Sequence, residues 1–268
     1  MKNGKVISFW SPVHGQGKIT TNACLISTYL SLIEDEKQVL SMDSQFIYSR
    51  MQELLKEDAE DGTSQIYTFV HSRNLDSEKL RIFTSGVIEN RLYLLGSTKQ
   101  SLVGEKVTEH LKDIIKCARE SYDYVIIDTN SGTFNKNTKK VLENSDLVIV
   151  NLPQEGHILD KFFGGKERFY HEALDKTKYI CVIGNYHPYK HFNLKKIKRW
   201  YGIKEIYKIP NNEELHKSIS DQRLVEWMIS NYNIDKKDDN REFINSISEI
   251  VDRIRESDNK RRSGFSFL

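Results

Sequence analysis

The sequence predicts an α/β fold in which a mostly parallel sheet is sandwiched by helices. Short apolar runs alternate with longer stretches of helical periodicity along most of the chain. A glycine-containing loop joins the first apolar run to the first helical stretch. Strands that alternate with helices are joined by right-handed crossovers, which place them in a parallel sheet with helices on both faces.

The individual elements follow from local patterns in chain order. Apolar runs rich in β-branched residues predict strands at 6–10, 38–42, 92–95, 124–128, 147–152, 179–184 and 205–209. Amphipathic patterns predict helices at 20–33, 48–55, 104–120, 138–144, 160–173, 193–200, 213–219 and 242–256. The acidic, glycine-containing segment 56–66 predicts a mobile surface loop.

Length and composition indicate one large domain. We assign residues 1–258 of the 268-residue chain to it, and we expect the basic and aromatic tail 259–268 to be flexible. A net charge of +2 gives no global preference for nucleic acid. The three cysteines lie in apolar stretches, and no apolar run is long enough to span a membrane. We therefore expect a cytoplasmic protein with buried, reduced cysteines.

The most informative motif lies in residues 5–22. An apolar run enters a loop that contains Gly15 and Gly17, and Lys18 and a helical pattern follow. This order of strand, glycine loop, lysine and helix is the layout of a phosphate-binding P-loop. Successive backbone N–H groups can surround an anion there, and they belong to Gly15, Gln16, Gly17 and Lys18. The sequence therefore predicts a P-loop NTPase type of fold.

Two positions depart from the P-loop pattern. Pro12 stands where the pattern has its first glycine, and Ile19 stands where it has the hydroxyl that binds Mg²⁺. Thr20 follows, but one residue along a helix is a rotation of about 100°, so its side chain is predicted to point away from a metal. We therefore expect phosphate binding to survive better than metal-assisted hydrolysis, and Ile19→Thr to raise hydrolysis.

The ordered set of motifs over residues 5–230 resembles the MinD/ParA group of P-loop ATPases, with the TadZ/CpaE-like pilus-localisation branch as the most similar. Residues 13–20 are similar to the K-G-G-x-G-K-T-T loop of that group. The segment QVLSMDSQ is similar to V-L-x-x-D-x-D, and YDYVIIDTNSG is similar to Y-D-x-x-I-I-D-x-x-x-G. The segments SDLVIVNLP, ICVIGN and IYKIPNNEEL continue the match.

The resemblance implies a set of site residues. ATP or ADP would be bound through the loop and two later strand ends, by Gly15, Gln16, Gly17, Lys18, Thr20, Thr21, Asn185 and Pro210. The catalytic roles would fall on Lys18, Asp43, Gln45 and Asp128, and Asp128 would hold Mg²⁺. Purely structural roles stay open, because an Asp or Asn after a strand commonly caps a turn.

Three replacements limit what the resemblance implies. The signature lysine, which reaches the partner's phosphates in a nucleotide-sandwich dimer, is Val13 in this chain. The Mg²⁺-binding threonine is Ile19, and the second aspartate of D-x-D is Gln45. We therefore expect slow or absent hydrolysis and weakened Mg²⁺ binding.

The favoured function is a nucleotide-binding homodimer that positions or recruits a larger assembly, such as pilus, secretion or partition machinery. The alternatives are an active ParA-type ATPase that partitions DNA and a pseudo-ATPase scaffold that binds no nucleotide. Basic residues interleave with aromatics in 186–208, and the tail 260–268 is basic and aromatic. Both segments are candidates for contact with DNA or an anionic membrane, which would make the protein membrane-peripheral. A solvated helix face and a disordered tail are the simpler interpretations.

Overall fold

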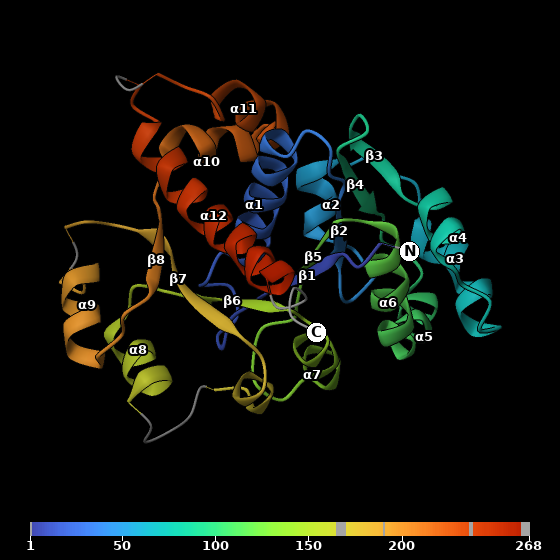
Figure 1. The fold of residues 1–268 in the computed structure, drawn as a ribbon, viewed down its shortest axis with the longest axis horizontal. Helices are drawn as coiled ribbons and strands as arrows, with labels where there is room; N and C mark the ends of the chain where they lie inside the picture. The colour runs from blue at the N-terminus through green and yellow to red at the C-terminus, as the bar shows by residue number, and fades with distance from the viewer. Residues whose placement is uncertain (1, 165–169, 190, 236–237, 264–268) are drawn as a thin grey trace.

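The computed structural model describes residues 2–164, 170–189, 191–235 and 238–263. An eight-stranded sheet runs through its centre in the order β3-β4-β2-β5-β1-β6-β7-β8 (Figure 1). The strands are β1 Lys5–Trp10, β2 Val39–Asp43, β3 Ser85–Ile88, β4 Leu92–Leu95, β5 Tyr124–Asp128, β6 Leu147–Leu152, β7 Tyr179–Tyr186 and β8 Ile206–Pro210. Among these described strands only the β3–β4 pair is antiparallel, so the predicted mostly parallel α/β fold is confirmed.

Helices cover both faces of this sheet. The α-helices are α1 Ile19–Ile33, α2 Arg50–Leu55, α3 Gly62–His71, α4 Ser77–Ile82, α5 Ser101–Glu109, α6 Leu111–Ser121, α7 Lys136–Glu143, α8 Gly156–Phe163, α9 Leu194–Tyr201, α10 Glu213–Ser220, α11 Leu224–Asn231 and α12 Arg241–Ser263. In Figure 1, α1, α10, α11 and α12 lie on one side of the sheet, and α5, α6 and α7 lie on the other. Separate apolar clusters fill the two sides, one around α1 and α12 and another around α6.

The strand order determines where a ligand can bind. The central strand β1 pairs with β5 on one side and with β6 on the other, and β2 lies beyond β5. Because these strands are parallel, their carboxyl ends share one edge of the sheet, where ligands of such folds bind. The pairing of β2 with β5 also sets Asp43 directly beside Asp128 at that edge.

Several elements were not predicted. The predicted loop 56–66 is wrong in its second half, because Asp61 caps α3 by accepting a hydrogen bond from the Ser64 amide at 2.8 Å. The sequence patterns also did not predict helices α4 and α11. The sequence pattern did not predict strand β3, because it is short, lies at the sheet edge and is only partly buried.

Some predicted helices have different bounds. The predicted helix 104–120 is two helices, α5 and α6, because the backbone leaves helical geometry at His110. The predicted helix 160–173 begins earlier, at Gly156, and α8 ends at Phe163, before the glycine at 164. Residues 165–169 lie outside the described residues, and Glu172–Asp175 forms a 3₁₀ turn.

The C-terminal helix is longer than predicted. α12 runs to Ser263 rather than ending at Glu256, because lysine and arginine, which favour helix, follow that position. Residues 264–268 of the predicted tail lie outside the described residues. Within the described part of the chain, no helix is long and apolar enough to cross a bilayer.

The cysteines have the predicted environment. Cys24, Cys117 and Cys181 are all buried and free. Burial is the main reason why the pKa of each thiol lies above its ordinary value. A thiol that stays protonated is a poor nucleophile, so these residues act as small core side chains.

Candidate functional site

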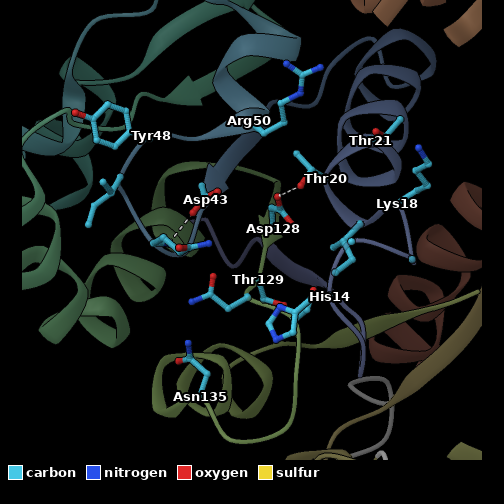
Figure 2. Close-up of a pocket in the computed structure, with 17 residues that line it drawn as sticks. His14, Lys18, Thr20, Thr21, Asp43, Tyr48, Arg50, Asp128, Thr129 and Asn135 are labelled. Atoms are coloured by element: carbon cyan, nitrogen blue, oxygen red, sulfur yellow. Dashed lines mark hydrogen bonds between the residues drawn. The ribbon is translucent and has the colours of Figure 1, made fainter. Parts of the chain in front are cut away.

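A cavity of about 650 Å³ lies at the carboxyl ends of β1, β2 and β5 (Figure 2). Six predicted site residues beyond the glycines line it, namely Lys18, Thr20, Thr21, Asp43, Gln45 and Asp128. They come from three separate parts of the chain, which the fold brings together at one edge of the sheet.

The glycine loop follows β1 and needs its two glycines for different reasons. Gly15 has a φ of 72°, a left-handed conformation that strains any residue with a Cβ. A Cβ on Gly17 would lie 2.9 Å from the carbonyl oxygen of Asn151 and 2.9 Å from the Ser11 hydroxyl. The loop therefore lies directly against β6, where a buried Asn22–Asn151 amide pair at 2.7 Å fixes α1.

The amides of the loop are available to a ligand. Among the described residues, no hydrogen-bond acceptor pairs with the backbone N–H groups of residues 15–18. Backbone donors at a helix start that lack an acceptor are suited to an anion. Lys18 is exposed and has left-handed backbone angles, φ 53° and ψ 36°, as the N-cap of α1.

Thr20, the second residue of α1 after the left-handed Lys18, faces the cavity. The helix begins only at Ile19, whose side chain is 8% exposed and packs in the core cluster around α1. The Thr20 hydroxyl then donates a 2.6 Å hydrogen bond to the Asp128 carboxylate (Figure 2). The prediction that Thr20 points away from a metal position is therefore wrong, because it assumed a helix without this left-handed residue. A hydroxyl does stand beside the strand-terminal aspartate.

Asp43 and Asp128 form a buried pair of carboxylates. Burial raises the pKa of Asp128, the adjacent Asp43 charge raises it further, and the Thr20 hydrogen bond opposes both. Burial also raises the pKa of Asp43, while hydrogen bonds lower it. Two adjacent carboxylates in a low dielectric are stable as anions only when a proton or a cation compensates their charge.

Asp43 is held by the loop that follows β2. Its carboxylate accepts hydrogen bonds from the Gln45 amide at 2.6 Å and from the Ser49 hydroxyl at 3.2 Å. The side chain of Gln45 is exposed and lines the cavity, so it is free to orient a ligand or a water. The same loop contains Phe46 and Tyr48 with positive φ, a strained backbone that hydrogen bonds to Thr98 stabilise.

The donor set fits Mg²⁺. Among the described residues, no group of three or more His, Cys, Asp or Glu side chains is placed to hold a metal. The cavity instead offers the Asp43 and Asp128 carboxylates and the Thr20 hydroxyl, all oxygen donors. Mg²⁺ prefers oxygen ligands and is commonly bound by one or two carboxylates together with phosphate oxygens and water.

A second cavity of about 200 Å³ continues from the first. Asn185 and Pro210, predicted to lie near a base, both line it, as do Lys18 and Thr21 from the loop. Gln16 is exposed and is not among the residues that line either cavity. The structure thus brings the predicted nucleotide-binding residues, Gln16 excepted, to two cavities that share Lys18, Thr21 and Arg50.

Sequence reasoning missed several residues that line these cavities. The side chains of Tyr48 and Arg50 border the first cavity from the loop after β2, and Arg50 borders the second as well. His14 lines the first cavity and lies beside Gly132, because a Cβ there would be 3.1 Å from the His14 Nε2 atom. The proximity of these residues in sequence to Gly15 or Asp43 was the available signal. The loop that carries Tyr48 and Arg50 has positive φ at Phe46 and Tyr48, and these residue types do not predict such angles.

No described residue of the basic and aromatic segment 186–208 lines either cavity. It contains α9, whose Lys195, Lys198, Arg199 and Trp200 are exposed. Tyr189 is 99% exposed, and Lys190 lies outside the described residues. The predicted contact with DNA or a membrane stays a prediction.

A family model described as an AAA domain matches residues 4–160, more than half of the chain. The chain belongs to this family of AAA domains. The match begins before β1 and ends in α8, so it contains the glycine loop, both carboxylates and Arg50. A search of curated proteins finds no match for this AAA-domain chain.

Solved structures share the fold of the chain at low identity. A ParA family ATPase from Chlorobium tepidum is 18% identical with a TM-score of 0.70, over 93% of this chain and 98% of that one. The septum site-determining protein MinD from Pyrococcus horikoshii, complexed with Mg-ADP, is 14% identical with a TM-score of 0.71, over 94% and 96%. A putative plasmid partition protein from Borrelia burgdorferi bound to AMPPNP is 21% identical with a TM-score of 0.61, over 96% and 99%. The chain thus shares the fold of MinD/ParA-type P-loop ATPases, as the resemblance predicted, and the TadZ/CpaE-like branch remains a prediction.

Proposed function

We propose that this protein binds ATP or ADP together with Mg²⁺ and uses the bound nucleotide to position or recruit a larger assembly. The outer phosphates would lie against the loop amides and Lys18, and the base would lie near Asn185 and Pro210. Nucleotide-dependent homodimerisation would couple binding to recruitment, at pilus, secretion or partition machinery. Such a protein would act in the cytoplasm or beside a membrane.

The observation that carries this proposal is the Thr20–Asp128 hydrogen bond at the rim of the loop. It supplies a hydroxyl and a carboxylate where an Mg²⁺-nucleotide would need ligands, although Ile19 is apolar. When bound, Mg²⁺ neutralises phosphate charge. The Mg-ADP complex of the archaeal MinD and the AMPPNP complex of the Borrelia protein support nucleotide as the ligand class.

Hydrolysis is proposed to be slow for a different reason than the sequence suggested. Thr20 compensates for Ile19, so the weakened steps are those that depend on Val13 and Gln45. Val13 carries no charge for the phosphates of a partner subunit, and Gln45 orients water without acting as an acid or base. We expect the double variant Val13→Lys, Gln45→Asp to turn over ATP about tenfold faster than the wild type. Equal turnover would contradict this assignment.

The direct experiment is a titration of labelled ATP with and without Mg²⁺, combined with a turnover assay. The proposal predicts binding that Mg²⁺ strengthens and turnover that is slow. Fast Mg²⁺-dependent turnover would favour the active partition ATPase. No binding in either condition would favour the pseudo-ATPase scaffold and would overturn the proposal.

A second candidate function, an active ParA-type partition ATPase, gains support from two observations. The Thr20 geometry supplies the hydroxyl that such an enzyme needs, and α9 presents exposed cations, Lys195, Lys198 and Arg199. Cations on a helix surface attract phosphate backbones with a strong salt dependence. A duplex-binding measurement at low salt tests this candidate, and it fails if the protein with ATP and Mg²⁺ binds no DNA.

A further inference from the structure

Arg50 occupies the junction between the two cavities. The residues that line both of them are Lys18, Thr21 and Arg50. Lys18 and Thr21 belong to the glycine loop and α1, whereas Arg50 is the first residue of α2. A ligand that extended from Asp128 in one cavity to Asn185 in the other would therefore pass between Arg50 and α1.

The backbone of Arg50 is held firmly in this position. The preceding residue, Ser49, caps α2 and donates its hydroxyl to the Asp43 carboxylate, and its backbone amide donates to Ser97 Oγ at 3.1 Å. The Tyr48 amide donates to the Thr98 carbonyl at 3.2 Å. The start of α2 is thus bound both to the buried carboxylate and to the loop after β4.

The Arg50 side chain is directed towards α1 and remains accessible. Figure 2 shows it extending from α2 on the side of the cavity where Thr21 lies. Its positive charge lowers the pKa of the Cys24 thiol on α1, although burial and the Asp128 charge raise that pKa more. The side chain is 54% exposed and pairs with Glu53, one turn along α2. An ion pair this exposed is weak, so a stronger anion can displace Glu53.

Charge in the two cavities is unbalanced without a second cation. The lining residues include the carboxylates Asp43 and Asp128, and position 13 of the loop is valine. A nucleoside diphosphate adds further negative charge at the junction. An arginine remains protonated at all physiological pH values and can donate two parallel hydrogen bonds to one phosphate.

We infer that Arg50 is a second phosphate-binding residue of this chain, which contacts the inner phosphates of a nucleoside diphosphate or triphosphate at the junction of the two cavities. This inference rests on the proposed nucleotide binding. Because the contact is to inner phosphates, it contributes to the binding of ADP and ATP and contributes nothing to adenosine.

The test measures the affinities of ADP and adenosine for the full chain, in EDTA, for the wild type, Arg50→Ala and Arg50→Lys. Lys56→Ala removes a partly exposed cation at the C-cap of the same helix and is the matched control. We expect Arg50→Ala to weaken ADP about tenfold, or about 1.4 kcal/mol, and to leave adenosine unchanged. Arg50→Lys should recover part of the loss, and Lys56→Ala should bind as the wild type does.

A second variant tests the same residue without removing it. Glu53→Gln breaks the ion pair of Arg50, so we expect ADP to bind up to threefold more tightly. Wild-type ADP affinity in Arg50→Ala would overturn the inference, as would equal weakening of ADP and adenosine, which would indicate a structural role. A wild-type protein that binds no ADP either in EDTA or with Mg²⁺ would instead refute the proposed function itself, and with it this inference.

Discussion

The two charged sides of the cavity are built in different ways. The acidic side is Asp43 and Asp128, which end two paired central strands and are 8% and 6% exposed. The basic side is Lys18 and Arg50, which lie at the starts of helices and are exposed. The acidic side is fixed by the sheet register, whereas the basic side can move its side chains towards a ligand. A ligand that bridges the two sides must therefore carry both a cation and an anion, as an Mg²⁺-nucleotide does.

Removal of the loop cation Lys18 should have the largest effect on nucleotide affinity. We expect Lys18→Ala to weaken ADP binding about 100-fold, or about 2.7 kcal/mol, because a charge-assisted contact to phosphate is lost. Calorimetric titration measures the change, and Lys112→Ala, an exposed cation on α6, should leave the affinity unchanged. A loss smaller than about threefold would mean that the loop amides bind the anion without Lys18.

A methyl group on Gly17 should disturb the loop itself. Gly17→Ala places a Cβ within 2.9 Å of the Asn151 carbonyl oxygen, a backbone atom that cannot move away easily. Overpacking of this kind costs about 1 to 3 kcal/mol of stability, and the loop would be displaced from β6. Denaturant unfolding checks the stability. The space beside Gly86 is open, so Gly86→Ala is the control and should change stability less.

Neutralising one carboxylate should stabilise the metal-free protein at alkaline pH. Burial, and then the Asp43 charge, raise the pKa of Asp128 in the folded state above its unfolded value. The folded state therefore binds the proton more tightly, and stability falls as the pH rises from the unfolded pKa through the folded one. We expect Asp128→Asn to be more stable than the wild type by about 1 to 3 kcal/mol at pH 8, with no difference near pH 4.

Thermal unfolding in EDTA at several pH values measures this difference. The exposed Asp58 offers a control, since Asp58→Asn should follow the wild type at every pH. Wild-type stability that is flat between pH 4 and pH 8 would argue against a strained carboxylate pair. With saturating Mg²⁺-nucleotide the wild type should be more stable than Asp128→Asn, because both carboxylates then serve as ligands in the wild type alone.

The smallest effect on ATP turnover is expected for Ile19→Thr, although the sequence alone predicted that this variant would hydrolyse ATP faster. Ile19 borders the cavity but is only 8% exposed and packs in the core cluster, so a threonine there would exchange apolar packing for a largely buried hydroxyl. We expect Ile19→Thr to cost about 1 kcal/mol of stability and to leave ATP turnover within twofold of the wild type. A clear rise in turnover would show that position 19, and not Thr20, faces the metal.

The sequence predicted the parts of the molecule that depend on burial. The central strands are apolar runs of the correct length, and their order places Asp43, Asp128 and the glycine loop at one edge. The edge strand β3 was missed because half-buried residues leave no apolar run. Helix α3 was missed because its N-cap, Asp61, lies within an acidic stretch typical of a loop.

The details of the site depended on backbone angles that side-chain type does not reveal. Lysine has no preference for left-handed angles, yet Lys18 adopts them directly before the helix in which Thr20 donates to Asp128. Phe46 and Tyr48 also have positive φ, and together they set where Arg50 begins α2. Hydrogen bonds with the distant Thr98 hold the angles of Phe46 and Tyr48, so a local pattern could not predict them.

The central claim is that Thr20 supplies the hydroxyl that Ile19 lacks. The most direct measurement is the ratio of ADP affinities in saturating Mg²⁺ and in EDTA, for the wild type, Thr20→Ser and Thr20→Val. We expect Mg²⁺ to tighten ADP binding in the wild type and in Thr20→Ser, and we expect this Mg²⁺-dependent gain in affinity to be at least about tenfold smaller, or about 1.4 kcal/mol, in Thr20→Val. An unchanged Mg²⁺ gain in Thr20→Val would contradict this claim.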